Sequence, residues 1–126
     1  MGSEEPRMTR KRRLLCEPQG DVTVVNFVEK KILDEMNIKE IGDELMELID
    51  QHHKDKILIN FDNVEYLSSA ALGKLITLSK RMQAKNGQLK LCEIAPSIYE
   101  IFRITKLNKF FEIHETEADA LAAFTQ

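Results

Sequence analysis

The short apolar run Ile57-Leu58-Ile59, continued by Phe61, constrains the fold of this chain more than any other feature. Successive side chains of a strand point to opposite faces of the sheet, so three large aliphatic residues in a row need a cover on both faces. Helical patterns precede and follow the run, and helices are the usual cover for such strands. The run therefore predicts a central strand in a sheet that helices cover.

A β-hairpin is predicted before this strand. Residues 13–17 and 22–28 are rich in β-branched or large apolar side chains, and Pro18-Gln19-Gly20-Asp21 between them is typical of a turn. Further strands are predicted over residues 89–94 and 110–113 because both stretches are short, apolar and bounded by turn residues or charges.

Apolar residues at helical spacing predict four helices. The first covers residues 36–49, with Asp34 and Asn37 as possible caps, and the second runs from Ser68 to about residue 86, where Gly87 is expected in the left-handed conformation. The third starts at Pro96, and the fourth follows a capping-box pattern at residues 116–119.

The predicted order is ββαβαβαβα, an α/β domain with a mixed, largely parallel sheet of about five strands and about four helices. A chain of 126 residues is one ordinary domain, which we place at residues 12–126. In such sheets function collects at the carboxyl ends of the strands, so the loops 29–36 and 62–69 are expected at one end of the sheet, close to any site.

Residues 1–11 are expected to form a tail outside the domain because only Met1 and Met8 are apolar. The basic side chains of this region could contact an acidic lipid surface or nucleic acid: Arg7, Arg10, Lys11, Arg12 and Arg13. A solvated tail is the preferred interpretation, since the stretch has no aromatic residue and no amphipathic pattern.

Composition excludes several classes of protein. The net charge of −3 argues against direct nucleic-acid binding by the whole domain, and no apolar stretch approaches the ~20 residues that span a bilayer. Cys16 and Cys92 lie in strand-like runs and are interpreted as small buried hydrophobic residues of a reducing compartment. The expected location is the cytoplasm.

Signatures of an enzyme are absent from the sequence. It has no glycine-rich phosphate loop, no metal-type cysteine pair and no nucleophile elbow. His52 and His53 are adjacent at a helix end, point in different directions and do not predict a metal site. We expect no catalytic residue, cofactor or metal, although an enzyme or a nucleotide-binding domain stays open as an alternative, because open α/β sheets often hold ligands at the ends of their strands.

The informative segment is residues 63–73, where Ser68 and Ser69 stand between a strand-derived loop and a helix. One interpretation is an N-cap, in which a hydroxyl accepts a hydrogen bond from the free amides of the first turn. The other is a phosphorylation site, since these amides and the helix dipole accommodate a phosphate. A partner docked there would have to bury the phosphate dianion, so one hydroxyl is sufficient as a switch.

This segment resembles the STAS-domain anti-sigma factor antagonists of bacteria, which carry an apolar or aromatic pair and then Asp-Ser-Ser/Thr-Gly-Leu-Gly at this junction. Here Tyr66-Leu67-Ser68-Ser69-Ala70-Ala71-Leu72-Gly73 occupies that frame. The resemblance extends over nearly everything after residue 12. It includes Leu33-Asp34, Ile57-Leu58-Ile59-Asn60-Phe61, Asn86-Gly87 and Ala95-Pro96-Ser97.

The resemblance implies a phospho-acceptor at Ser69, with Ser68 as the alternative, and a partner-binding surface made of Asp34, Ser68, Ser69, Ala70 and Gly73. It also implies that the unmodified domain binds an anti-sigma factor, a serine kinase of the GHKL type, and so frees a sigma factor. The kinase phosphorylates the domain and a phosphatase resets it. On this basis the domain is a substrate and ligand and not an enzyme.

The chain departs from the family pattern at three positions of the motif. Ser68 stands where the family has Asp, and Ala70 and Ala71 replace the second hydroxyl and the first Gly. The usual Gly ahead of Leu-Asp is also replaced within residues 29–31. These departures keep a second hypothesis open, that of a constitutive STAS scaffold that assembles through the same helix without phosphorylation.

Overall fold

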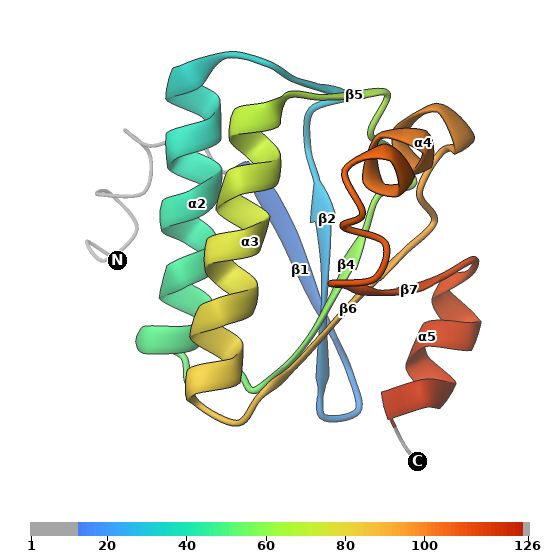
Figure 1. The fold of residues 1–126 in the computed structure, drawn as a ribbon. Coiled ribbons are helices and arrows are strands. Elements are labelled where there is room, and N and C mark those ends of the chain that lie inside the picture. The colour runs from blue at the N-terminus through green and yellow to red at the C-terminus, as the bar shows by residue number, and fades with distance from the viewer. Residues whose placement is uncertain (1–12, 125–126) are drawn as a thin grey trace.

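A mixed five-stranded sheet forms the centre of residues 13–124, the part of the chain that the computed structural model describes (Figure 1). Its strands stand in the spatial order β1-β2-β4-β6-β7, with β1 antiparallel to β2 and all other neighbours parallel. Their bounds are β1 (Leu14–Gln19), β2 (Val22–Phe27), β4 (Lys56–Asn60), β6 (Gln88–Cys92) and β7 (Glu112–His114).

Four helices within the described residues complete the predicted order: α2 (Glu35–Asp50), α3 (Ser69–Ala84), α4 (Pro96–Ile104) and α5 (Glu117–Phe124). Helices α2 and α3 lie side by side on one face of the sheet, and α5 covers the other face (Figure 1). The α/β fold class, the mixed sheet of five strands and the four helices are thus confirmed.

The apolar run of β4 packs as predicted. Ile57 and Ile59 belong to the main core under α2 and α3, whereas Leu58 points to the opposite face and packs in a second cluster with Phe124 of α5. All three side chains are fully buried. The two-sided cover explains why β4 is apolar without alternation.

Two short strands were not predicted, β3 (Lys31–Ile32) and β5 (Tyr66–Leu67). They pair in parallel as a separate two-stranded sheet, with Lys31 opposite Tyr66 and Ile32 opposite Leu67. A strand of two residues is too short to show a periodic pattern, which is why the sequence showed only loops here. The pairing confirms that the loops 29–36 and 62–69 lie together.

Two local predictions were wrong. The left-handed residue after α3 is Asn86, with φ of 59°, and not Gly87. Gly87 is instead placed where a Cβ would lie 3.0 Å from the carbonyl oxygen of Asp55. The last strand starts at Glu112 and not at residue 110, because Phe111 is drawn into the core against Phe102.

The cysteine prediction was correct for Cys92, which is fully buried, and wrong for Cys16, which is exposed. Cys16 lies on the edge strand β1, where every residue after Leu14 is exposed. The tail predicted at residues 1–11 lies outside the described residues, as does residue 12.

Candidate functional site

The pairing of β3 with β5 brings the two predicted site loops into register. Beyond the ladder itself, the backbone N–H groups of Glu65 and Tyr66 donate to the carbonyl oxygen of Lys30, at 2.7 and 3.2 Å, and the N–H of Ser68 donates to Ile32 at 3.2 Å. Helix α2 begins three residues after Ile32, and helix α3 begins two residues after Leu67. The amino ends of both helices therefore lie at the same end of the molecule, close to β5 (Figure 1).

Ser68 is the N-cap of α3. Its backbone is extended (φ −79°, ψ 166°), and its Oγ accepts a hydrogen bond from the N–H of Ala71 at 3.2 Å. The side chain is half-buried, and the carbonyl oxygen of Ser68 accepts the first helical bond, from Leu72. The capping interpretation is therefore correct for this serine, since its hydroxyl satisfies one of the amides of the first turn.

Ser69 is the first residue of α3 and is exposed. Its hydroxyl makes no hydrogen bond with any residue in the described part of the chain, and its N–H is one of those that an α-helix leaves without an internal acceptor. The two adjacent serines thus differ: one hydroxyl is used by the helix, and the other faces solvent.

Asp34 holds the matching position on the neighbouring helix, as the N-cap of α2. Its Oδ1 accepts from the N–H groups of Met36 at 2.8 Å and Asn37 at 3.4 Å. Asp34 follows Ile32 by two residues as Ser69 follows Leu67, so both residues extend the β3–β5 register by the same step. Asp34 is exposed, so its second carboxylate oxygen is open to a partner.

Two residues of α3 shortly after Ser69 have no side chain larger than a methyl group. Ala70 and Gly73 are both exposed, and a Cβ built at Gly73 would meet nothing within 4 Å. The packing of this protein would therefore allow a larger residue than glycine at position 73. The backbone of α3 is accessible there to a molecule that approaches from outside.

Large apolar side chains that the sequence analysis did not assign to the site lie in the same two loops, 29–36 and 62–69. Leu33, Met36 and Tyr66 are 53%, 61% and 57% exposed, which is high for residues of this type. The Lys31 ammonium lies 5.7 Å from the centroid of the Tyr66 ring. The sequence could have pointed to them only through their positions in the two loops, close to Asp34 and Ser68. The spacing of residues in a loop does not predict which of them are exposed.

The described residues give little support for a metal site, a reactive cysteine or a membrane-spanning helix. Between residues 13 and 124 no group of three or more His, Cys, Asp and Glu side chains is arranged to hold a metal ion. Burial, reinforced by the carboxylates of Glu117, Glu93 and Asp62, raises the pKa of the Cys92 thiol to about 12, so this thiol is a poor nucleophile. No helix in the same range is both long enough and apolar enough to cross a membrane.

Comparison with known proteins identifies the family of this fold. The model of the STAS domain family matches residues 15–120. BtrV of Bordetella bronchiseptica, whose name assigns it to the anti-sigma factor antagonists, is 26% identical over 93 residues, which is 74% of this chain and 79% of that protein. The anti-sigma F factor antagonist of Paenibacillus polymyxa is 24% identical over 60% of this chain, and this chain spans 64% of that protein's length.

A solved structure has the same architecture. The Bacillus cell fate determinant SpoIIAA in its phosphorylated form superposes with a TM-score of 0.68, at 19% identity, over 88% of this chain and 98% of that one. The same protein, named an anti-sigma factor antagonist, gives a TM-score of 0.68 in its unphosphorylated form. The match over most of the chain, together with the fold and the serine-bearing strand-to-helix junction, shows that this chain belongs to the STAS domain family.

Proposed function

We propose that this STAS domain is an anti-sigma factor antagonist that is switched by phosphorylation of Ser69. In the unmodified state it binds an anti-sigma factor, a serine kinase of the GHKL type, and so frees a sigma factor in the bacterial cytoplasm. The kinase transfers phosphate from ATP to Ser69, and a phosphatase removes it. The domain itself acts as substrate and ligand and performs no catalysis.

The observation that carries this proposal is the division between the two serines. Ser68 caps α3, and the exposed hydroxyl of Ser69 projects from the first turn beside it. A kinase can therefore modify Ser69 without breaking the cap. The helix amides and dipole stabilise the added charge of about −1.5 to −2, so the modified domain should keep its fold.

The apolar residues near Ser69 support a docking function. Leu33, Met36 and Tyr66 offer a partner large side chains to bury, and the small residues Ala70 and Gly73 allow close approach to α3. A partner seated on this surface would enclose the Ser69 side chain. Burying an uncompensated dianion costs several kcal/mol, which weakens binding more than a hundredfold.

Phosphorylation is tested by incubating the domain with ATP and each purified GHKL-type serine kinase of the source cell, followed by mass spectrometry of the peptide that contains both serines. We expect one phosphate on the native chain and on the Ser68→Ala variant, and none on Ser69→Ala. Phosphate on Ser68 in the native chain would assign the alternative acceptor. If neither serine is phosphorylated, the proposed phosphorylation switch is wrong.

A constitutive scaffold is the second candidate, and the motif itself provides the reason to retain it. Ser68 and Ala70 stand where the family pattern has a carboxylate and a second hydroxyl, so a kinase has fewer groups to recognise. In that case the same surface would bind its partner permanently. Equal partner affinity of Ser69→Asp and the native chain would favour the scaffold.

A further inference from the structure

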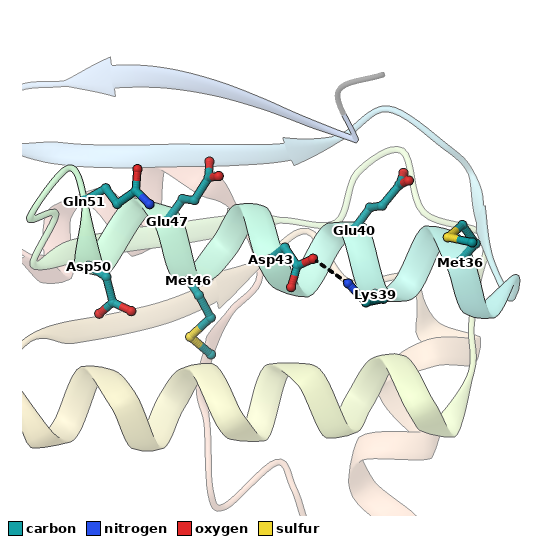
Figure 2. A pocket seen from close by; sticks show the side chains of 8 residues that line it. All are labelled: Met36, Lys39, Glu40, Asp43, Met46, Glu47, Asp50 and Gln51. Carbon is teal, nitrogen blue, oxygen red and sulfur yellow. Dashed lines mark hydrogen bonds and ion pairs between the residues drawn. The ribbon is translucent and has the colours of Figure 1, made fainter. Parts of the chain in front are cut away.

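The two loops that form the candidate site are fixed to different parts of the fold. Loop 29–36 is fixed to α2 and to the start of β1, because Glu29 accepts a hydrogen bond from the Asn37 side chain at 2.9 Å and also binds the Arg13 guanidinium. Arg13 in turn donates to Glu40 at 2.7 Å. In Figure 2 Glu40 points from α2 toward the β1–β2 hairpin, which Arg13 precedes. This loop therefore forms one unit with α2.

Hydrogen bonds join loop 62–69 to that unit in two ways. The first is the β3–β5 ladder with its flanking backbone bonds, and this ladder contains only two residue pairs, fewer than most strand pairs have. The second is the side chain of Asn63, whose Nδ2 donates to the backbone carbonyl oxygens of Phe27 and Val28, both at 3.1 Å. In the described part of the chain, no other side chain makes a hydrogen bond between this loop and the segment 27–36.

The place of Asn63 explains why a side-chain amide is used there. The last residue pair between β2 and β4 is Asn26 with Asn60, so the carbonyl oxygens of Phe27 and Val28 lie beyond the end of this ladder. An asparagine amide has two N–H donors and can satisfy both oxygens at once. Asn63 thus continues the contact to β2 at the point where β4 has ended.

We propose that Asn63 is a positioning residue for the partner surface. By holding loop 62–69 against the end of β2, it sets the spacing between Ser69, which ends this loop, and Asp34 on the other loop. A partner that contacts both residues then meets a surface that is already in place, so less free energy is lost in ordering it. This role rests on the proposed function, because only docking at both helix ends depends on that spacing.

Hydrogen exchange of the full chain tests whether Asn63 holds the loop. The N–H groups of Glu65, Tyr66 and Ser68 bond to carbonyl oxygens within residues 30–32, so their exchange reports how firmly the two loops are joined. In Asn63→Ala we expect these three amides to exchange at least ~3-fold faster, as for the loss of one neutral hydrogen bond, with the amides of β4 and β6 unchanged. Unchanged exchange at all three would overturn the positioning role.

Kinase kinetics test whether the position of the loop matters to the partner. The KM of the GHKL-type serine kinase for Asn63→Ala should rise at least ~3-fold at unchanged kcat, because the variant docks less well and still presents the Ser69 hydroxyl. Ala120→Gly is the matched control, since it weakens α5 on the other face of the sheet. It should leave the KM and the exchange of the three amides as in the native chain.

The outcomes separate this role from the switch itself. An unchanged KM for Asn63→Ala would overturn the positioning role. An equal rise for Ala120→Gly would overturn it as well, since the effect would then come from lost stability. A native chain that the kinase leaves without phosphate would instead reject the proposed function and the partner role with it, while the exchange rates would still show whether Asn63 holds the loop.

Discussion

Ser68 and Ser69 are neighbours with different physical environments, and this difference decides which of them can act as a switch. The Ser68 hydroxyl is half-buried and bound to the N–H of Ala71, so its modification would remove the cap. The Ser69 hydroxyl is exposed on the same turn. A modification at Ser69 therefore changes the surface of the molecule and leaves its interior unchanged.

Alanine substitutions should separate the two roles. We expect Ser68→Ala to lower the free energy of unfolding by about 1 kcal/mol, because one amide of the first turn loses its acceptor. Ser69→Ala should change it by less than ~0.5 kcal/mol, as is usual for an exposed site. Urea unfolding of both variants measures this. A larger loss for Ser69→Ala than for Ser68→Ala would contradict the assigned cap.

Gly73 provides an independent test of the partner surface. A methyl group at this position meets no atom within 4 Å, and alanine favours a helix by up to ~1 kcal/mol over glycine. Gly73→Ala should therefore be as stable as the native chain or more stable, while its affinity for the partner falls because the methyl group stands between α3 and the docked surface. Calorimetric titration and a thermal melt measure the two effects. Unchanged affinity would place Gly73 outside the interface.

Among the elements, those that bury a periodic face were predictable and those that depend on another segment were not. The helix α2 and the strand β4 follow directly from the spacing of apolar residues. The strands β3 and β5 contain two residues each and exist because each pairs with the other, across more than 30 residues of sequence. The same limit applies to the proposed partner surface: the resemblance implied Asp34 and Ser69, whereas the exposure of Met36 and Tyr66 could be seen only in the structure.

The pairing of β6 with β7 predicts a pH-dependent contribution to stability. The hydrogen bond from the nearly buried Lys90, 2.8 Å away, lowers the pKa of Glu112 below its ordinary value of 4.5, with His114 acting in the same direction and burial opposing it. A carboxylate whose pKa is lower in the folded state than in the unfolded state stabilises the fold at pH values above its unfolded pKa. This contribution is lost as the pH falls through the folded pKa.

Glu112→Gln should therefore lower the unfolding free energy at about pH 7, and its effect should become smaller as the pH falls below the unfolded pKa. We expect a loss of about 1–2 kcal/mol at neutral pH, less than for a fully buried pair, because Glu112 is half exposed and water screens it. Urea unfolding at neutral pH and at a pH below the unfolded pKa gives the difference, since urea is uncharged and does not screen the ion pair, and Glu115→Gln, at an exposed carboxylate nearby, is the control. An equal loss at both pH values would mean that the carboxylate charge is not the cause.

For the molecule as a whole, the two-sided cover of the sheet leaves the amino ends of α2 and α3 as the place where function can change without refolding. The core clusters lie on the two faces of the sheet, and the site lies at its end, beyond the strands. A charge added at that end should leave the core packing unchanged. The account therefore predicts that binding and stability respond separately to a change at Ser69.

The most direct measurement is the affinity of the kinase partner for Ser69→Asp compared with the native chain, with Ser97→Asp as the matched control at the first turn of α4. We expect Ser69→Asp to bind at least ~10-fold more weakly, a loss of about 1.4 kcal/mol, with an unchanged thermal melt. Ser97→Asp should bind as the native chain does. Equal affinity for all three proteins would contradict the switch and leave a constitutive STAS scaffold.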